Sequence, residues 1–191
     1  MKTIRTMMAA LALVASAQAW AANPPELGAE QIQTEVNDNT HVGANGYLRI
    51  AQVFELHDTG YLSHLMLPLS CPANAIVEVV IEEAPGGIPS GNVLAQQRVP
   101  GYVLDAVQSG NYGAAMRMIE FARPAALKPG RYAFIITVRG KDTCGLWRAP
   151  AGLTYPYYSY VMNSTAAGWQ LHADPNGTPR MLAFQVFQRP L

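Results

Sequence analysis

Metal binding is the first chemistry that the residue types of this sequence allow. Four histidines, His41, His57, His64 and His172, could ligate zinc, but their spacings match no zinc motif. The segment Asp174-Pro175-Asn176-Gly177-Thr178 offers alternating oxygen atoms that could hold calcium, although it lacks the distal glutamate of an EF-hand loop. We therefore interpret this segment as an Asx-type turn, and we predict neither a metal nor another cofactor.

Nucleophilic and acid-base chemistry is the second possibility. Asp58-Thr59-Gly60 matches the triplet of aspartic proteases, in which two such aspartates share a proton. Here His57 comes before the triplet instead of an apolar strand, and only a homodimer could supply the second aspartate. We expect a turn, with a dimeric hydrolase as the alternative. Because Ser90 stands one place too late for a Gly-Xaa-Ser-Xaa-Gly elbow, we predict a protein that is not an enzyme.

The strongest functional signal is a group of aromatic residues late in the chain, among predicted loops. Flat rings with polar tips suit amphipathic ligands such as sugars, because each ring offers apolar area at little entropic cost. The alternative for each ring is that it fills the core or covers its ends. The predicted ligand-binding residues are Trp147, Tyr155, Tyr157, Tyr158 and Trp169.

The two cysteines, Cys71 and Cys144, predict one disulfide bond. In an oxidising compartment, pairing is the ordinary fate of two cysteines in a small exported domain. A reactive thiol is the alternative, but an exported free thiol would oxidise. We expect the bond to join the end of an early strand to the region after the central strand.

The first residues predict export. Lys2 and Arg5 precede a short apolar run over 7–17, and small residues before Ala22 permit cleavage, so we interpret 1–21 as a signal peptide. No later run approaches the roughly 20 apolar residues that a membrane-spanning helix needs. We predict a mature protein in the periplasm or outside the cell, without a membrane span.

The charge of the mature chain argues against polyanionic partners. Basic and acidic residues each number 13, so loss of Lys2 and Arg5 leaves a formal charge of −2. Such a surface has no bulk attraction for phosphate backbones or anionic lipids. We therefore predict no nucleic-acid partner.

The stretch Lys128-Pro129-Gly130-Arg131 reads as a tight turn that leads into a strand over 132–138. This strand is almost continuously apolar, as expected when both faces of a strand are covered, so it should lie in the middle of a sheet. Most other expected strands alternate, with Val77, Val79 and Ile81 as one apolar face. The further strands are expected over 48–56, 61–69, 76–83, 93–99, 116–121, 144–148 and 181–187, with a short one near 168–171.

Three local expectations follow from the same patterns. Residues 22–46 are polar and rich in turn residues, so we expect an N-terminal arm with at most one short edge strand, followed by one domain over 47–191. In the strand over 61–69, simple alternation groups Leu62 with His64 and Met66, and Pro68 indicates an edge position or a bulge near its end. In the loop over 100–113, apolar side chains are expected to cover one end of the core; these are Tyr102, Val103, Leu104 and Val107.

About eight or nine short strands with turns between them predict an all-β fold. We favour a two-sheet antiparallel β-sandwich, arranged like a jelly roll, over a closed barrel. Several segments in order resemble the bacterial exported β-sandwich modules called choice-of-anchor domains, which are similar to jelly-roll carbohydrate-binding modules. The resemblance spans about 51–187 and rests on 52–54, 59–63, 89–95, 127–133, 145–147, 168–169 and 183–186.

The resemblance implies a fold and an exported setting, not an activity. With the late aromatic residues, it leads to the hypothesis of a module that binds a glycan or another surface polymer. The alternative is a structural or interaction subunit of a cell-envelope or surface assembly, whose partner would be an envelope protein.

Overall fold

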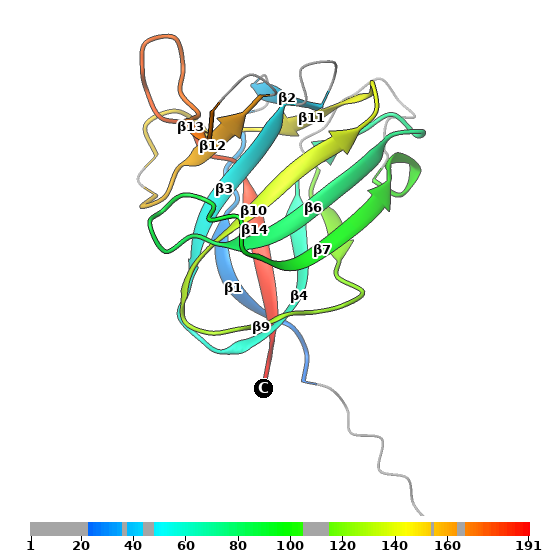
Figure 1. Ribbon diagram of the computed structural model, residues 1–191, viewed down its shortest axis with the longest axis vertical. Coiled ribbons are helices and arrows are strands. Elements are labelled where there is room, and N and C mark those ends of the chain that lie inside the picture. Colours follow the sequence, from blue (N-terminus) through cyan, green and yellow to red (C-terminus); the bar gives the residue numbers. More distant parts are fainter. Residues whose placement is uncertain (1–22, 36–37, 44–47, 105–114, 154, 164–166) are drawn as a thin grey trace, which may run out of the picture.

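The computed structural model describes residues 23–35, 38–43, 48–104, 115–153, 155–163 and 167–191 (Figure 1). The predicted signal peptide, the cleavage site before Ala22 and the predicted core contact of Val107 lie outside the described residues. No helix in the described ranges has the length and apolar character needed to cross a membrane.

The larger sheet has six strands, all paired antiparallel, with β10 near its middle. Tyr132 to Ile136 are buried on both faces of β10, which confirms the prediction of a central strand. Its neighbours are β3 and β6, as the register of both pairs records. In spatial order the strands are β13 (Gln170–Leu171), β12 (Ser159–Met162), β3 (Arg49–Leu56), β10 (Gly130–Arg139), β6 (Ile76–Glu83) and β7 (Val93–Pro100).

A five-stranded sheet packs against the larger one, and three short strands close one end (Figure 1). The five-stranded sheet holds β1 (Glu26–Gln31), β14 (Phe184–Pro190), β4 (Gly60–Leu67) and β8 (Arg117–Glu120), with β9 (Ala126–Leu127) also paired to β4. The three short strands are β2 (Asn39–Gly43), β11 (Thr143–Trp147) and β5 (Leu69–Ser70). The predicted all-β, two-sheet antiparallel sandwich is therefore confirmed.

The core lies between the two large sheets. Val77, Val79 and Ile81 point into it with no exposed area, as their alternation predicts. Rings from both sheets meet at its centre, where the centroid of Phe184 on β14 lies 6.3 Å from that of Phe54 and 5.4 Å from that of Phe134. This burial of aromatic and branched side chains drives the two sheets together.

A bulge in β4 changes which side chains face outward. Across the pair with β14, His64 stands opposite Phe187 and Leu62 opposite Gln188, which leaves Ser63 without a partner. The extra residue shifts the alternation, so Leu62 is buried in the core while His64 is half-buried on the outer face. The predicted grouping of Leu62 with His64 is therefore wrong.

Pro68 does not mark an edge strand. β4 lies inside its sheet, between β14 and β8, and ends at Leu67 directly before the proline. The ladder stops there because proline has no N–H group to donate. The irregularity of β4 is at Ser63, well before the predicted position.

The segment before residue 47 contributes two strands, more than the single short one that we predicted. β1 pairs with β14 and β2 pairs with β11, so the polar N-terminal segment is part of the sheet structure. A close approach makes this possible, because a Cβ atom on Gly28 would lie 2.8 Å from side-chain atoms of Leu56 and Gln188. The N-terminal segment forms strands because it pairs with the edges of other strands, although its composition did not predict them.

The segment after β7 also differs from its prediction. It forms a short 3₁₀ turn, η1 (Gly101–Val103), and Leu104 is fully buried in the core. Tyr102 and Val103, however, point into solvent, with 67% of Tyr102 exposed. Only one of the three described side chains therefore covers the core.

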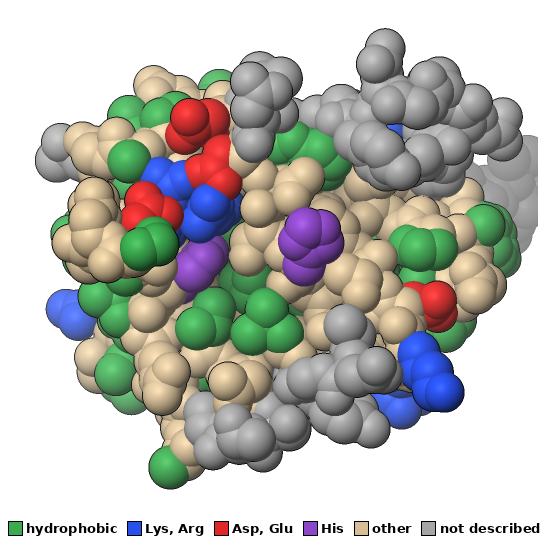
Figure 2. All heavy atoms as spheres, turned by 90° about the horizontal axis from the view of Figure 1, so that it is seen from above, with side chains coloured by type: hydrophobic (Ala, Val, Ile, Leu, Met, Phe, Trp, Pro, Cys, Tyr) green, Lys and Arg blue, Asp and Glu red, His purple; other side chains and the backbone are tan. Residues whose placement is uncertain are grey.

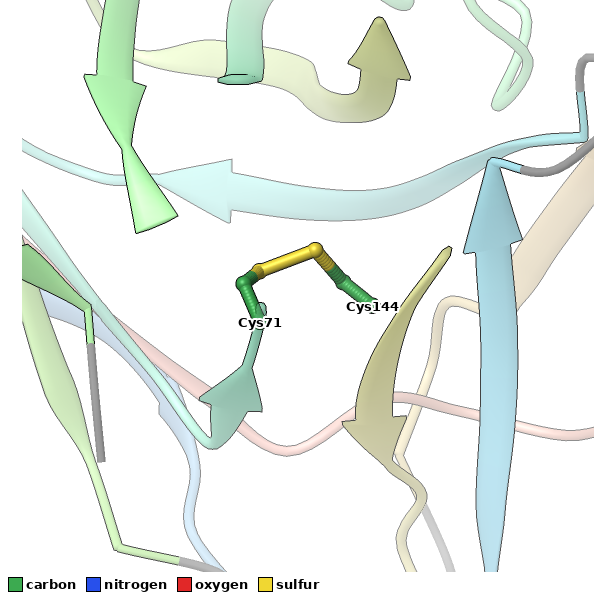
Figure 3. The surroundings of a disulfide bond; sticks show 2 residues. All are labelled: Cys71 and Cys144. Atoms are coloured by element: carbon green, nitrogen blue, oxygen red, sulfur yellow. A yellow bond between two sulfur atoms is a disulfide. The ribbon is translucent and has the colours of Figure 1, made fainter. Parts of the chain in front are cut away.

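The predicted disulfide bond is present between Cys71 and Cys144 (Figure 3). Cys71 follows β5 and Cys144 lies on β11, and both are buried in the core. The bond joins residues 73 positions apart, so it ties the end of the early strand region to the strand after β10.

Candidate functional site

Two of the predicted ligand-binding aromatic residues belong to the core. Trp147 on β11 is only 2% exposed. Tyr155 is partly buried, with its ring edge-on to Phe184 at 5.8 Å and to Tyr157 at 6.0 Å. Burial, with Tyr157 and Glu55 nearby, raises the pKa of the Tyr155 hydroxyl. These two rings pack inside the protein, as the alternative interpretation of the aromatic residues expected.

Tyr157 is not part of a strand of the larger sheet, and its hydroxyl group is already hydrogen-bonded within the protein. Its hydroxyl donates a hydrogen bond to Glu55 Oε2, and this bond raises the pKa of Tyr157. The guanidinium of Arg131 lies 5.7 Å from the centre of its ring. Glu55 and Arg131 are themselves cross-strand partners on β3 and β10, so the arrangement is a side-chain network within the sheet.

Tyr158 and Trp169 lie apart from this network. Tyr158 is exposed and Trp169 is partly buried, and within the described ranges no ring contact joins either of them to Trp147, Tyr155 or Tyr157. Among the five predicted residues, the ring contacts within the described ranges join Tyr155 with Tyr157, and Trp147 is buried.

A groove of about 660 Å³ is lined by residues of the five-stranded sheet and its loops. The strand ends that line it lie at the end of the sandwich where the chain terminates (Figure 1). Its walls are the last residues of β14 and the loop between β8 and β9, and its floor is the start of β4. We call it the Tyr61 groove. Its lining residues are Asn23, Tyr61, Leu62, Ser63, Glu120, Phe121, Ala122, Pro124, Arg189, Pro190 and Leu191.

Local pairing explains how the groove forms. Arg189 of β14 stands directly opposite Tyr61 of β4. On the other side of β4, Phe121 N–H donates to Ser63 O at 3.2 Å and Leu62 N–H donates to Ala125 O at 2.9 Å. These two bonds anchor the ends of the loop between β8 and β9, and the residues between them form the opposite wall.

The side chains of the groove are suited to a ligand that is both apolar and polar. The ring of Tyr61 is 44% exposed. The pKa of His64 is lowered chiefly by burial, while Glu120 raises it and Arg189 lowers it, so both charges act near His64. Within the described residues, neither Arg189 nor Glu120 forms an ion pair or a side-chain hydrogen bond, so the groove offers an open donor in Arg189, across from Tyr61, and an open acceptor in Glu120.

Sequence reasoning missed the groove because its residues come from distant parts of the chain. Tyr61 was assigned to a strand, and Glu120 and Arg189 carried no motif. The register of β14 with β4, and of β4 with β8, brings them together. The sequence held one signal: Tyr61 is an aromatic residue at the start of a predicted strand, directly after the turn at Gly60.

A cluster of charged side chains lies at the other end, beside the three short strands. Arg180, only 4% exposed, forms ion pairs with Asp38 and with Asp174, the latter at 3.2 Å from its Nε. Arg148 contacts the same two aspartates. Figure 2 shows this end of the molecule, where acidic and basic side chains lie against one another near a histidine. The cluster fastens the segment before β2 to the rest of the sandwich.

The Asp174 segment is a turn, as predicted. Gly177 N–H donates to Asp174 O at 2.8 Å, and Thr178 N–H donates to Asn176 Oδ1 at 3.0 Å. The Asp174 carboxylate faces the two arginines. In the described part of the chain, no group of three or more histidine, cysteine or acidic side chains is placed to hold a metal. Asp58 is exposed in the turn between β3 and β4.

His172 is buried beside this cluster. Its Nδ1 lies 2.9 Å from Ser159 Oγ, and that hydroxyl donates to Arg180 O. The pKa of His172 is lowered to about 4, chiefly by burial and also by Arg148, while Asp174 opposes them. The buried imidazole is therefore neutral at neutral pH.

We expect His172 to make the protein less stable in mild acid. The unfolded state binds a proton near the ordinary histidine pKa of 6.5, while in the folded state the pKa is about 4, so stability falls as pH drops from 6.5 toward 4. The loss attributable to His172 is about 3 kcal/mol. Urea unfolding at several pH values should show a flatter profile in His172→Gln than in wild type. The exposed His41→Gln is the control, and a profile unchanged by His172→Gln would contradict the assignment.

Comparison with known proteins supports the fold. No protein-family model matches this sequence, and no curated protein matches it. Among solved structures, the chain is similar to the crystal structure of the cysteine protease and lectin-like domains of Cwp84, a surface layer associated protein of Clostridium difficile. The TM-score is 0.50 with 14% identity, over 76% of this chain and 33% of that chain. At this identity the similarity establishes a shared fold alone.

Proposed function

We propose that this chain is an exported, non-enzymatic module that binds a glycan or another surface polymer in the Tyr61 groove. The observation that carries the proposal is the exposed Tyr61 in a groove that also holds Arg189, directly across from it, and Glu120, which form no ion pair within the described residues. A sugar ring has an apolar face that stacks on an aromatic side chain. Its hydroxyl groups both donate to a carboxylate and accept from a guanidinium.

Two further observations support the proposal. The buried disulfide bond fits an oxidising compartment, which agrees with the export signal read in the sequence. The similar structure from the surface layer associated protein includes a lectin-like domain beside a cysteine protease domain, and it shares the fold at low identity over 33% of its length. Neither observation names the sugar.

We expect Tyr61→Ala to weaken glycan binding by about tenfold or more, because it removes the stacking surface from the groove. The measurement is affinity electrophoresis of the mature protein in gels that contain cellulose derivatives, xylan, mannan or soluble chitosan, followed by a glycan array with and without calcium. Arg189→Gln should weaken binding as well, since the amide keeps hydrogen bonding but loses the charge.

The matched control is Tyr102→Ala, because Tyr102 is also an exposed tyrosine but lies in η1. Binding lost equally in Tyr102→Ala and Tyr61→Ala would place the site elsewhere. No binding above background to any polysaccharide on the array would contradict the proposed function. Release of reducing ends from a bound polysaccharide would contradict its non-enzymatic part.

An interaction subunit of an envelope assembly is the second candidate. It is favoured by apolar side chains on the outer face of the five-stranded sheet, where Leu27 is 47% and Met118 is 52% exposed. Crosslinking in intact cells tests it, with Met118→Glu as the variant. A protein that stays monomeric and gives the same crosslinks in wild type and Met118→Glu would eliminate this candidate.

A further inference from the structure

The larger sheet ends in an open edge at β7. This strand is the outermost of the sheet (Figure 1) and, among the described residues, it pairs with β6 alone. The edge strand on the opposite side, β13, has only 2 residues, whereas β7 has 8. An edge of this length presents a row of backbone groups with which another extended segment can pair.

The strand register shows which backbone groups of β7 point away from β6. Just beyond the ladder of the two strands, Gly101 N–H donates to Ala75 O at 2.7 Å. Because hydrogen-bonded and non-hydrogen-bonded pairs alternate in an antiparallel ladder, Gln97 bonds to β6, while Gln96 and Arg98 turn their backbone groups to the open side. The Arg98 carbonyl accepts from Gln97 Nε2 at 3.0 Å. In the described part of the chain, the N–H and C=O of Gln96 and the N–H of Arg98 have no hydrogen bond.

A groove of about 500 Å³ is lined by β7 and by Arg123, which comes from the loop between β8 and β9. This loop is held beside the open edge, because Ala122 N–H donates to Gln97 Oε1 at 3.0 Å. The position of Arg123 is therefore tied to that of the strand. We call this space the β7 groove; its lining residues are Val93, Leu94, Ala95, Gln96, Arg98 and Arg123.

The side chains that line the β7 groove carry only positive charge. Arg123 is exposed and forms no ion pair or hydrogen bond within the described residues. Arg98 is 56% exposed, and although its Nε lies 2.8 Å from Glu78, that carboxylate is shared with Arg139. The Glu82 carboxylate, opposite the start of β7, is buried and already accepts a backbone N–H. A carboxylate that enters the groove therefore meets positive charge that is not neutralised.

The same charge distinguishes between two kinds of extended partner. Two copies of β7 paired edge to edge would bring the arginines of both copies into one interface, which is electrostatically unfavourable. The bulge at Leu94 also interrupts the edge, and bulges and outward charges both discourage pairing between identical edges. A segment with carboxylate side chains bonds to the same backbone groups and gains favourable charge contacts.

We propose that β7 is a docking edge for an extended, acidic segment of a partner protein. The segment adds a strand to the larger sheet through the backbone of Gln96 and Arg98, and its carboxylates face Arg98 and Arg123. A segment of about six residues, roughly 20 Å long, covers the stretch from Val93 to Arg98. This inference goes beyond the proposed function and does not depend on it, because Gln96 and Arg98 line no part of the Tyr61 groove.

The experiment is selection of a phage-displayed library of random peptides on the mature protein, followed by fluorescence anisotropy with the enriched peptides. We expect the enriched sequences to combine aspartate and glutamate with β-branched residues. Arg123→Glu should bind these peptides about tenfold more weakly or worse, because it reverses the unpaired charge of the groove. The matched control is Arg49→Glu, an equal change of charge at an exposed arginine on β3, which should keep the wild-type affinity.

Backbone pairing is tested separately from charge. Gln96→Pro removes an N–H group that points away from β6, so it should weaken peptide binding by about tenfold or more and leave glycan binding unchanged. Peptides with N-methyl groups on alternate residues make the same test without altering the protein. Only one of the two alternate sets of N–H groups in an added strand faces β7. Methylation of that set should abolish binding, and methylation of the other should not.

The remaining results would each overturn a stated part. No enrichment above background, or enriched sequences without an excess of acidic residues, would overturn the inference. Affinity unchanged in Arg123→Glu would do the same. Equal binding by both methylated peptides would show that the arginines attract anions without strand pairing, and a wild-type dimer that dissociates in Gln96→Pro would show that a second copy occupies the edge. Acidic peptides that bind at β7 while no glycan binds would contradict the proposed function and leave this inference in place.

Discussion

Replacing both cysteines by alanine should lower the free energy of unfolding by roughly 4 kcal/mol, the cost expected in the chain-entropy model for losing a crosslink over 73 residues. The bond ties Cys71, after β5, to Cys144 of β11, so the unfolded chain without it gains the freedom of the whole region between them. Both cysteines are buried, and alanine places no polar group in the core. Urea unfolding of the double variant against oxidised wild type measures the difference.

Wild type unfolded in the presence of a reductant is the matched control. It should lose a similar amount of stability, because it lacks the same crosslink and keeps the native side chains. A double variant whose unfolding free energy lies within about 1 kcal/mol of oxidised wild type would show that the crosslink does not set the stability of the domain. Glycan binding should persist in the folded double variant, since Cys71 and Cys144 line no part of the Tyr61 groove.

Arg180→Ala should cost about 3 kcal/mol, because it removes a buried arginine from two partly buried carboxylates and leaves them with Arg148 alone. Arg180 lies almost fully inside the protein and contacts Asp38 and Asp174, which come from opposite ends of the chain. Arg148 pairs with the same aspartates, so part of the compensation remains. Arg180→Lys keeps the charge but not the planar fork, and we expect it to recover only part of the loss. Chemical unfolding followed by tryptophan fluorescence measures all three proteins.

The matched control is Arg98→Ala, because Arg98 pairs with Glu78 at 2.8 Å while its own side chain is 56% exposed. A solvent-exposed pair of this kind contributes less than about 1 kcal/mol. If Arg180→Ala were no more costly than Arg98→Ala, the cluster beside β2 would not be fastening the N-terminal segment. Limited proteolysis before β2 should also become faster in Arg180→Ala than in wild type.

Local pattern was enough to predict most of the scaffold. Apolar continuity in 132–138 predicted a central strand, and alternation in 76–83 predicted its inward face, because side-chain direction along a strand has a fixed period. Two cysteines in a chain with a predicted export signal predicted the disulfide bond for a chemical reason that needs no coordinates. The turn at Asp174 could also be predicted from the sequence, because asparagine and glycine favour turn geometry locally.

Composition alone could not tell which aromatic residues are inside. Trp147 and Tyr155 look like Tyr158 in the sequence, yet the first two pack in the core and the last is exposed. The difference depends on how β11 and the segment between β11 and β12 pack against the rest of the domain, which the local sequence does not show. For the same reason, residues 22–46 appeared to be an arm although they supply two strands.

The Tyr61 groove, the stacked rings of His64 and Phe187 and the ion pairs of Arg180 were decided by tertiary structure. One unpaired residue, Ser63, moves His64 to the outer face, and cross-strand register then sets Arg189 beside Tyr61 and Phe187 beside His64. The sequence by itself determined a disulfide-bonded β-sandwich and predicted its export, because strand periodicity, cysteine chemistry and a leader pattern are local properties. Pairing register is non-local, since it is set by the simultaneous fit of all strands, and only the folded chain could bring these side chains together.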